Sequence, residues 1–110
     1  MNFTSELRDS YAEVTADGRL NMVAAPQLRE FIGNLITDGS PRIVLNLEKT
    51  SFMDSSGLGA LIGCLKAARQ AGGDLRIAGV TPQVRMVLQL TSMDKVLAPY
   101  ATVEEAFSND

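Results

Sequence analysis

Polar and apolar residues alternate near the start of the chain, whereas a later segment is almost continuously apolar. The alternation over residues 11–16 predicts a β-strand, and the extended segment 3–9 is expected to pair with it as a hairpin. Residues 17–18, Asp-Gly, are a turn signal that would end this strand. The apolar run 43–47 predicts a central strand covered on both faces, and residues 75–80 predict another strand.

Three segments between and after these strands carry apolar residues at helical spacing. Pro26 suits the first turn of the first helix, and residues 38–39, Asp-Gly, end it. Gly59 and Gly63 are poor helix formers in the second helix, so we expect close backbone approach there, against the sheet or a partner. Thr102 opens a capping box that starts a final short helix. The three apolar stripes are Leu28, Phe31, Ile32, Leu35 and Ile36; Leu58, Leu61, Ile62, Leu65 and Ala68; and Val84, Val87, Leu88 and Thr91.

The order of these elements predicts the fold class. A helix between the strands 43–47 and 75–79 implies a βαβ unit, in which the two strands are parallel. With the hairpin, this unit predicts an α/β fold with a mixed sheet of four or five strands and helices packed on it. Residues 93–100 are expected to be a connector or a short edge strand. No linker, low-complexity segment or internal repeat divides the 110 residues, so residues 1–110 are expected to form a single domain.

Composition excludes several classes of function. The net charge is −3 and there is no basic cluster, so direct binding of nucleic acid is not expected. No apolar run reaches membrane-spanning length, and the first residues lack a signal pattern, so no membrane insertion is expected. The single cysteine, Cys64, rules out a disulfide within the chain and favours a reducing compartment. We therefore expect a cytoplasmic protein.

The absence of histidine restricts the chemistry further. It removes the commonest general base and metal ligand, so a Ser-His-Asp arrangement cannot be built and a metal site is not expected. No glycine-rich motif that cradles phosphate is present, and no cofactor is expected. Ser55 could be a nucleophile in an enzyme, but Met53 stands where a nucleophile elbow has its first glycine. We expect no catalytic residues and no enzymatic activity.

The stretch 52–59, Phe-Met-Asp-Ser-Ser-Gly-Leu-Gly, joins a strand to the second helix and is the candidate site. Asp54, Ser55 and Ser56 are all good helix N-caps, and Ser56 is the one expected to act purely as a cap. A hydroxyl is thus expected near the surface at the positive end of a helix, as a cap or as a place where an anion is added. Gly57 meets a conformational need, and Leu58 is either core or a partly exposed anchor for a partner.

Residues 46–48 and 52–59 resemble the signature of the STAS domain, and in particular that of bacterial anti-sigma-factor antagonists. The similarity extends over nearly the whole chain and includes the Gly-x-Leu of residues 18–20, Gly72-Gly73 and Thr81-Pro82. It implies a protein that binds an anti-sigma factor with GHKL-type serine kinase activity and thereby frees a sigma factor. The kinase then phosphorylates the first serine of the motif, which ends the interaction, and a metal-dependent serine phosphatase restores it.

Transferred to this sequence, the resemblance implies phosphorylation at Ser55. Many relatives carry an acidic residue where this chain has Asn21, which puts an ion pair with the partner at that position in doubt. The alternative within the same fold is a STAS scaffold subunit of a stress-signalling assembly or of a membrane transporter complex. The residues expected to contact the partner are Asn21, Met53, Asp54, Ser55, Ser56, Gly57 and Leu58.

The effect of such a phosphate follows from its charge. A phosphate adds about −1.5 to −2 charges, and the positive end of a helix tolerates it. Inside an interface the same group must be desolvated beside Asp54, which is costly. The predicted switch is therefore a surface event that leaves the backbone of the antagonist nearly unchanged.

Overall fold

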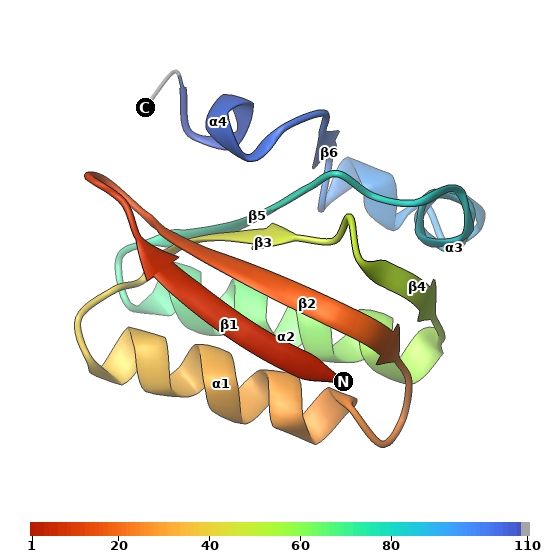
Figure 1. Ribbon diagram of the computed structural model, residues 1–110, viewed down its shortest axis with the longest axis horizontal. Helices are drawn as coiled ribbons and strands as arrows, with labels where there is room; N and C mark the ends of the chain where they lie inside the picture. The colour runs from red at the N-terminus through yellow and green to blue at the C-terminus, as the bar shows by residue number, and fades with distance from the viewer. Residues whose placement is uncertain (109–110) are drawn as a thin grey trace.

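The computed structural model describes residues 1–108 and contains a six-stranded mixed sheet with α-helices on both of its faces (Figure 1). The predicted α/β fold is confirmed, with more strands than the four or five expected. The elements are β1 Asn2–Leu7, β2 Ala12–Leu20, α1 Ala25–Thr37, β3 Arg42–Asn46, β4 Thr50–Met53, α2 Ser55–Gln70, β5 Asp74–Ala78, α3 Pro82–Leu90, a 3-10 turn Met93–Lys95, β6 Pro99–Tyr100 and α4 Val103–Ala106.

The strands lie in the order β1-β2-β3-β5-β6, and β4 pairs with β2 beyond the end of β3. β1 and β2 form the predicted antiparallel hairpin, and the other pairs are parallel. The expected parallel pairing of the strands around 43–47 and 75–79 is confirmed, because Ile43 lies opposite Leu75 and Leu45 opposite Ile77.

The long strand β2 corrects one expectation, since residues 17–18 do not form a turn. Gly18 adopts φ 127°, the pairing register shifts between Gly18 and Arg19, and the strand continues to Leu20. The first half of β2 pairs with β3 and its end pairs with β4. The glycine thus produces a bulge that carries the strand onward to a second neighbour.

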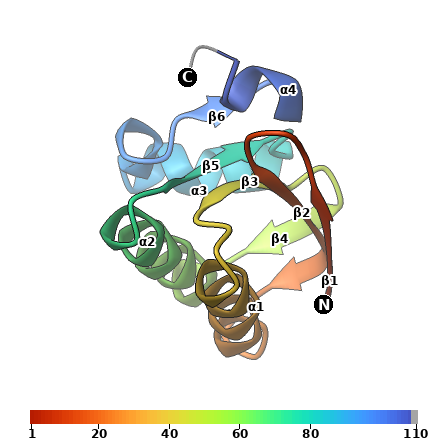
Figure 2. The ribbon, with the colours of Figure 1, turned by 90° about the vertical axis from the view of Figure 1, so that its left-hand side faces the viewer.

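The main core lies between the sheet and the helices α1 and α2, which run side by side under one face (Figure 2). The predicted stripes supply it, because Leu28, Ile32, Leu61 and Leu65 are all buried. In the third stripe Val84 and Leu88 are buried as well. These helices hold their positions by burying apolar surface, at about 25 cal/mol per Å².

The opposite face is covered by α4 (Figure 1). Thr102 starts this helix as predicted, with its hydroxyl accepting a hydrogen bond from the Glu105 N–H at 3.3 Å. The ring of Phe107 lies 4.6 Å from Cζ of Arg42 and 4.2 Å from Cζ of Arg76, so two guanidinium groups pack on it. Phe107 thus packs the segment at the end of α4 against β3 and β5.

Of the two alternatives expected for Gly59 and Gly63, close approach to the sheet is wrong, whereas approach by a partner stays a prediction. Both residues are exposed on α2. A side chain at Gly59 would meet nothing within 4 Å, and one at Gly63 would only reach Nε of Arg29 at 3.9 Å. The glycine of α2 that is held in close contact is Gly57, at the candidate site.

Candidate functional site

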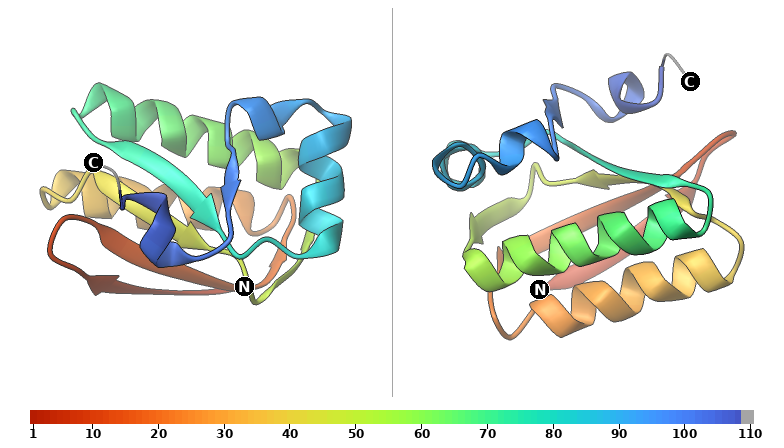
Figure 3. Two further views of the ribbon diagram at one scale, coloured as in Figure 1. Left: turned by 90° about the horizontal axis from the view of Figure 1, so that it is seen from above. Right: turned by 180° about the vertical axis from the view of Figure 1, so that it is seen from behind.

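Four segments meet at one end of the molecule: the loop between β2 and α1, strand β4, and the first turns of α2 and α3 (Figure 3, right). Residue 54 joins two of them, because its N–H donates to the Leu20 carbonyl at 3.3 Å just before α2 begins. The four segments come from different parts of the chain. The stretch 52–59, which contains the end of β4 and the start of α2, lies at their centre.

Asp54 is the residue that caps α2. Its backbone is extended, with φ −106° and ψ −175°, and its Oδ1 accepts a hydrogen bond from the Gly57 N–H at 2.9 Å. The expectation that Ser56 is the cap is wrong, because Ser56 already lies inside the first turn of the helix. The longer reach of the aspartate side chain lets it satisfy the orphan N–H from outside the helix.

Ser55 is the first residue of α2, and it is exposed. Because Asp54 makes the cap bond, the helix start does not depend on the Ser55 hydroxyl. The first turn itself contains no acidic residue. The positive helix end favours an anion added at the exposed Ser55 hydroxyl, whereas the neighbouring Asp54 carboxylate opposes it.

Gly57 is required by a close approach between α2 and β2. A Cβ built on Gly57 would lie 2.8 Å from Cγ of Leu20 and would clash with the Leu20 carbonyl oxygen. The missing side chain allows the start of α2 to lie directly against the end of β2. Gly57 therefore brings Ser55 next to the loop that follows Leu20.

That loop presents two exposed apolar side chains. The Asn21 Oδ1 accepts hydrogen bonds from the N–H groups of Val23 and Ala24, each at 3.1 Å, which fixes the shape of the loop. Met22 and Val23 are left 71% and 70% exposed. Two adjacent exposed apolar side chains on an ordered loop are a candidate docking surface. The sequence signal that could have identified them is an apolar pair outside every helical stripe.

Three of the residues expected to contact a partner are buried. Met53 is 1% exposed and Leu58 is 7% exposed, and Gly57 is buried against β2. Of the two alternatives left open for Leu58, core or partly exposed anchor, the structure selects core. The side chains of Met53 and Leu58 thus face the interior of the domain, and their contact with a partner stays a prediction.

Strand β4 is held from its other side by α3, a contact that sequence reasoning missed. The Met53 N–H donates to Oε1 of Gln83 at 2.8 Å, and Nε2 of Gln83 donates to the Met53 carbonyl at 3.1 Å. The Thr81 hydroxyl donates to the Thr50 carbonyl at 3.1 Å. No local pattern marks these contacts, because they join residues about thirty positions apart.

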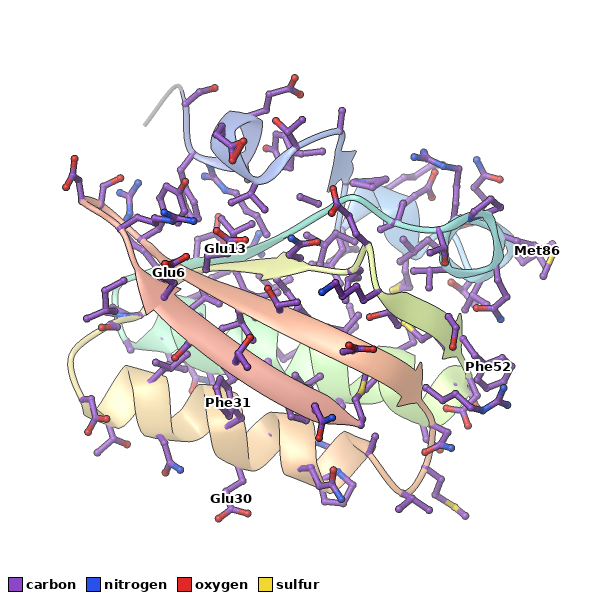
Figure 4. All side chains as sticks on the ribbon, viewed as in Figure 1. Glu6, Glu13, Glu30, Phe31, Phe52 and Met86 are labelled. Atoms are coloured by element: carbon purple, nitrogen blue, oxygen red, sulfur yellow. The ribbon has the colours of Figure 1, made fainter. Side chains whose placement is uncertain are left out.

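Further along the same end of the molecule, Phe52 and Met86 lie at the surface (Figure 4). Cζ of Arg19 lies 4.2 Å from the centre of the Phe52 ring, and Met86 on α3 is 50% exposed. A guanidinium group on an aromatic face keeps both side chains ordered at low cost. Phe52 belongs to the stretch 52–59, and Met86 is an exposed residue of α3 outside that stretch.

The STAS domain family model matches residues 2–106, which is nearly the whole of the described chain. The chain belongs to the STAS domain family. Its sequence is 33% identical over 97 residues to the anti-sigma-B factor antagonist of Staphylococcus aureus, covering 88% of this chain and 90% of that protein. The resemblance stated from the motif is thereby confirmed.

Solved structures of anti-sigma factor antagonists are similar to this STAS domain. An anti-sigma factor antagonist from Mycobacterium paratuberculosis matches with a TM-score of 0.85 at 28% identity, covering 97% of this chain and 91% of that one. The Bacillus cell fate determinant SpoIIAA in its phosphorylated form matches with a TM-score of 0.72 at 29% identity, covering 97% of each chain. Its unphosphorylated form, described as an anti-sigma factor antagonist, matches at 0.70 with the same identity, covering 97% and 96%.

Three other features bear on the function of this STAS domain: metal ligands, membrane-spanning helices and the cysteine thiol. Within residues 1–108, no group of three or more His, Cys, Asp or Glu side chains is placed to hold a metal ion. No helix in this part of the chain is long and apolar enough to cross a membrane. Burial raises the pKa of the Cys64 thiol to about 11, which keeps it protonated and unreactive at neutral pH.

Proposed function

We propose that this STAS domain is an anti-sigma-factor antagonist that binds an anti-sigma factor with GHKL-type serine kinase activity and is switched off by phosphorylation at Ser55. Binding in the unphosphorylated state releases the sigma factor, and a serine phosphatase resets the switch. The observation that carries the proposal is the exposed Ser55 on a helix start that Asp54 already caps. A serine of this kind is free to be a substrate.

The exposed surface beside Ser55 supports a role in docking. Met22 and Val23 are about 70% exposed on a loop whose shape is fixed by Asn21. Apolar side chains on an ordered loop lose little entropy when a partner covers them. In this proposal Asn21, Met22, Val23, Ser55 and Ser56 face the anti-sigma factor, and the buried residues of the motif hold them in place.

Charge explains how the phosphate ends the interaction. Asp54 contributes one negative charge, and phosphorylation of Ser55 adds about −1.5 to −2 more at the neighbouring residue. A kinase can accommodate this charge in the transfer step, but a closed interface must desolvate it. A penalty of about 3 kcal/mol would lower the affinity for the anti-sigma factor roughly a hundredfold.

The switch requires no refolding of the antagonist. The positive end of α2 stabilises an added phosphate by about 0.3–1 kcal/mol, so the folded domain tolerates it. We therefore propose that the surface changes its charge while the fold is retained.

The proposal is tested by mixing the protein with anti-sigma factor kinases and ATP and recording the intact mass. We expect one added phosphate on the wild type and none on Ser55→Ala. Ser56→Ala is the matched control, because it removes a hydroxyl one residue away, and it should still accept one phosphate. Phosphate uptake by Ser55→Ala equal to that of the wild type would refute the assignment.

A further inference from the structure

Strand β4 has an unusual second neighbour. Within residues 1–108 it pairs with β2 along one edge, and its other edge faces the start of α3 instead of a strand (Figure 1). Thr81 and Gln83 supply the hydrogen bonds that a strand would have made there, to the backbone of Thr50 and Met53. Buried backbone groups need such partners, since an unsatisfied one costs about 1–3 kcal/mol.

Of the two residues, Gln83 bonds the part of β4 that is nearer to Ser55, because its partner is Met53 and that of Thr81 is Thr50. Its amide both accepts from and donates to residue 53, at 2.8 and 3.1 Å, and the Met53 carbonyl belongs to the peptide bond that leads into Asp54. The next restraint on this peptide is the Asp54 N–H bond to Leu20, which is longer, at 3.3 Å. Of these contacts, the pair from Gln83 is the stronger constraint on where the cap of α2 begins.

The position of the cap decides where the Ser55 hydroxyl points. Asp54 has extended backbone angles and Ser55 has helical ones, so the chain changes direction between them. A small rotation of the Met53–Asp54 peptide would be passed on to the first turn of α2. Gln83 lies on a different helix and does not belong to the surface around Met22 and Val23.

We propose that Gln83 is a positioning residue for the phosphorylation of Ser55, an inference that rests on the proposed function. In that reaction the Ser55 hydroxyl oxygen forms a bond to the γ-phosphorus of ATP. ADP leaves with the electron pair of the broken P–O bond, and the hydroxyl proton passes to the kinase. Gln83 touches none of these atoms and acts by holding the peptide that precedes Asp54.

Positioning and docking predict different kinetic effects. Gln83→Ala removes both hydrogen bonds while the exposed loop residues stay unchanged. We expect kcat for phosphorylation to fall about tenfold and KM to change by less than about twofold, because the hydroxyl is misplaced in an intact complex. Gln89→Ala is the matched control, since Gln89 is exposed on the same helix, and it should leave both constants unchanged.

A second variant protects the test against simple unfolding. Gln83→Glu keeps the shape and the acceptor for the Met53 N–H, but its carboxylate cannot donate to the Met53 carbonyl. We expect a native circular dichroism spectrum and a loss of kcat smaller than that of Gln83→Ala. Amide hydrogen exchange at Met53 should accelerate at least about tenfold in Gln83→Ala and remain unchanged at Ile32 in the core.

The possible outcomes separate the inference from the proposed function. A wild type that is phosphorylated at Ser55, together with Gln83 variants of lower kcat and unchanged KM, supports the inference. Equal kcat in wild type and Gln83→Ala, or unchanged exchange at Met53, overturns the inference and leaves the proposed function in place. Failure of the wild type to accept phosphate from every anti-sigma factor kinase of its genome overturns both.

Discussion

Gly57→Ala and Gly59→Ala are the same substitution two residues apart in one helix, and we predict that they change stability in opposite directions. The added Cβ at Gly57 would lie 2.8 Å from Cγ of Leu20, well inside the separation of about 3.5–4.0 Å at which carbon atoms attract. It would also clash with the Leu20 carbonyl, which accepts the hydrogen bond of Asp54. The clash with the carbonyl cannot be relieved without moving the backbone of β2 or α2.

The size of the difference follows from two opposing effects. Overpacking of this kind costs about 1–3 kcal/mol, whereas alanine in place of a helical glycine gains about 1 kcal/mol. Gly57→Ala is therefore expected to lower the free energy of unfolding by up to about 2 kcal/mol. At Gly59 a Cβ meets nothing within 4 Å, so Gly59→Ala should raise the free energy of unfolding by about 0.5–1 kcal/mol.

Urea denaturation followed by circular dichroism measures both values. Equal m-values, the slopes of the free energy of unfolding against urea concentration, would show that the denatured states of the two variants are comparable. An increase in the denaturation midpoint of Gly57→Ala that matches the increase in Gly59→Ala would refute the close packing of α2 on Leu20.

Three further predictions test other parts of the site and core. Asp54→Ala should lower the free energy of unfolding by about 1 kcal/mol in urea, because it removes the cap of α2; an unchanged value would contradict the cap assignment. Met22→Ser combined with Val23→Ser should weaken binding to the anti-sigma factor at least about tenfold in calorimetry, while the urea midpoint stays constant. Because the pKa of Cys64 is raised from 9.0 to about 11, its thiol is protonated in the native state up to high pH. The unfolded state deprotonates first, so stability should fall between about pH 9 and 11 more in the wild type than in Cys64→Ala.

Most of the fold could be predicted because its signals are local. Apolar stripes located the helices, and the strands around 43–47 and 75–79 were correctly expected to be parallel. Thr102 was correctly read as the start of the last helix. The helices and the cap follow from residues within a few positions of one another, and the parallel pairing follows from the order strand, helix, strand.

The errors arose where distant residues decide the local structure. Asp17-Gly18 is a turn signal in the sequence, but β2 continues past Gly18 because residues 18–20 pair with β4. β4 itself went unpredicted because its four residues form a strand only beside β2. The choice of Gly57 as the tightly packed glycine depends on the carbonyl of Leu20, which no helical pattern reveals.

In the candidate site too, some residues are identified by the local sequence and others only by the folded structure. Ser55 was identified from its neighbours along the chain, and its exposure at the start of α2 agrees with that prediction. The exposed pair Met22 and Val23 and the support from Gln83 were missed, because their relation to Ser55 exists only in the folded domain. Met53 belongs to the motif but faces the core.

The central claim is that charge at one hydroxyl controls affinity for the anti-sigma factor. The most direct measurement is the Kd of that complex for the unphosphorylated protein and for the same protein phosphorylated at Ser55, measured by calorimetry without ATP. We predict that phosphorylation raises Kd by roughly a hundredfold, with near-identical circular dichroism spectra of the two forms. Equal dissociation constants for the two forms would contradict the account.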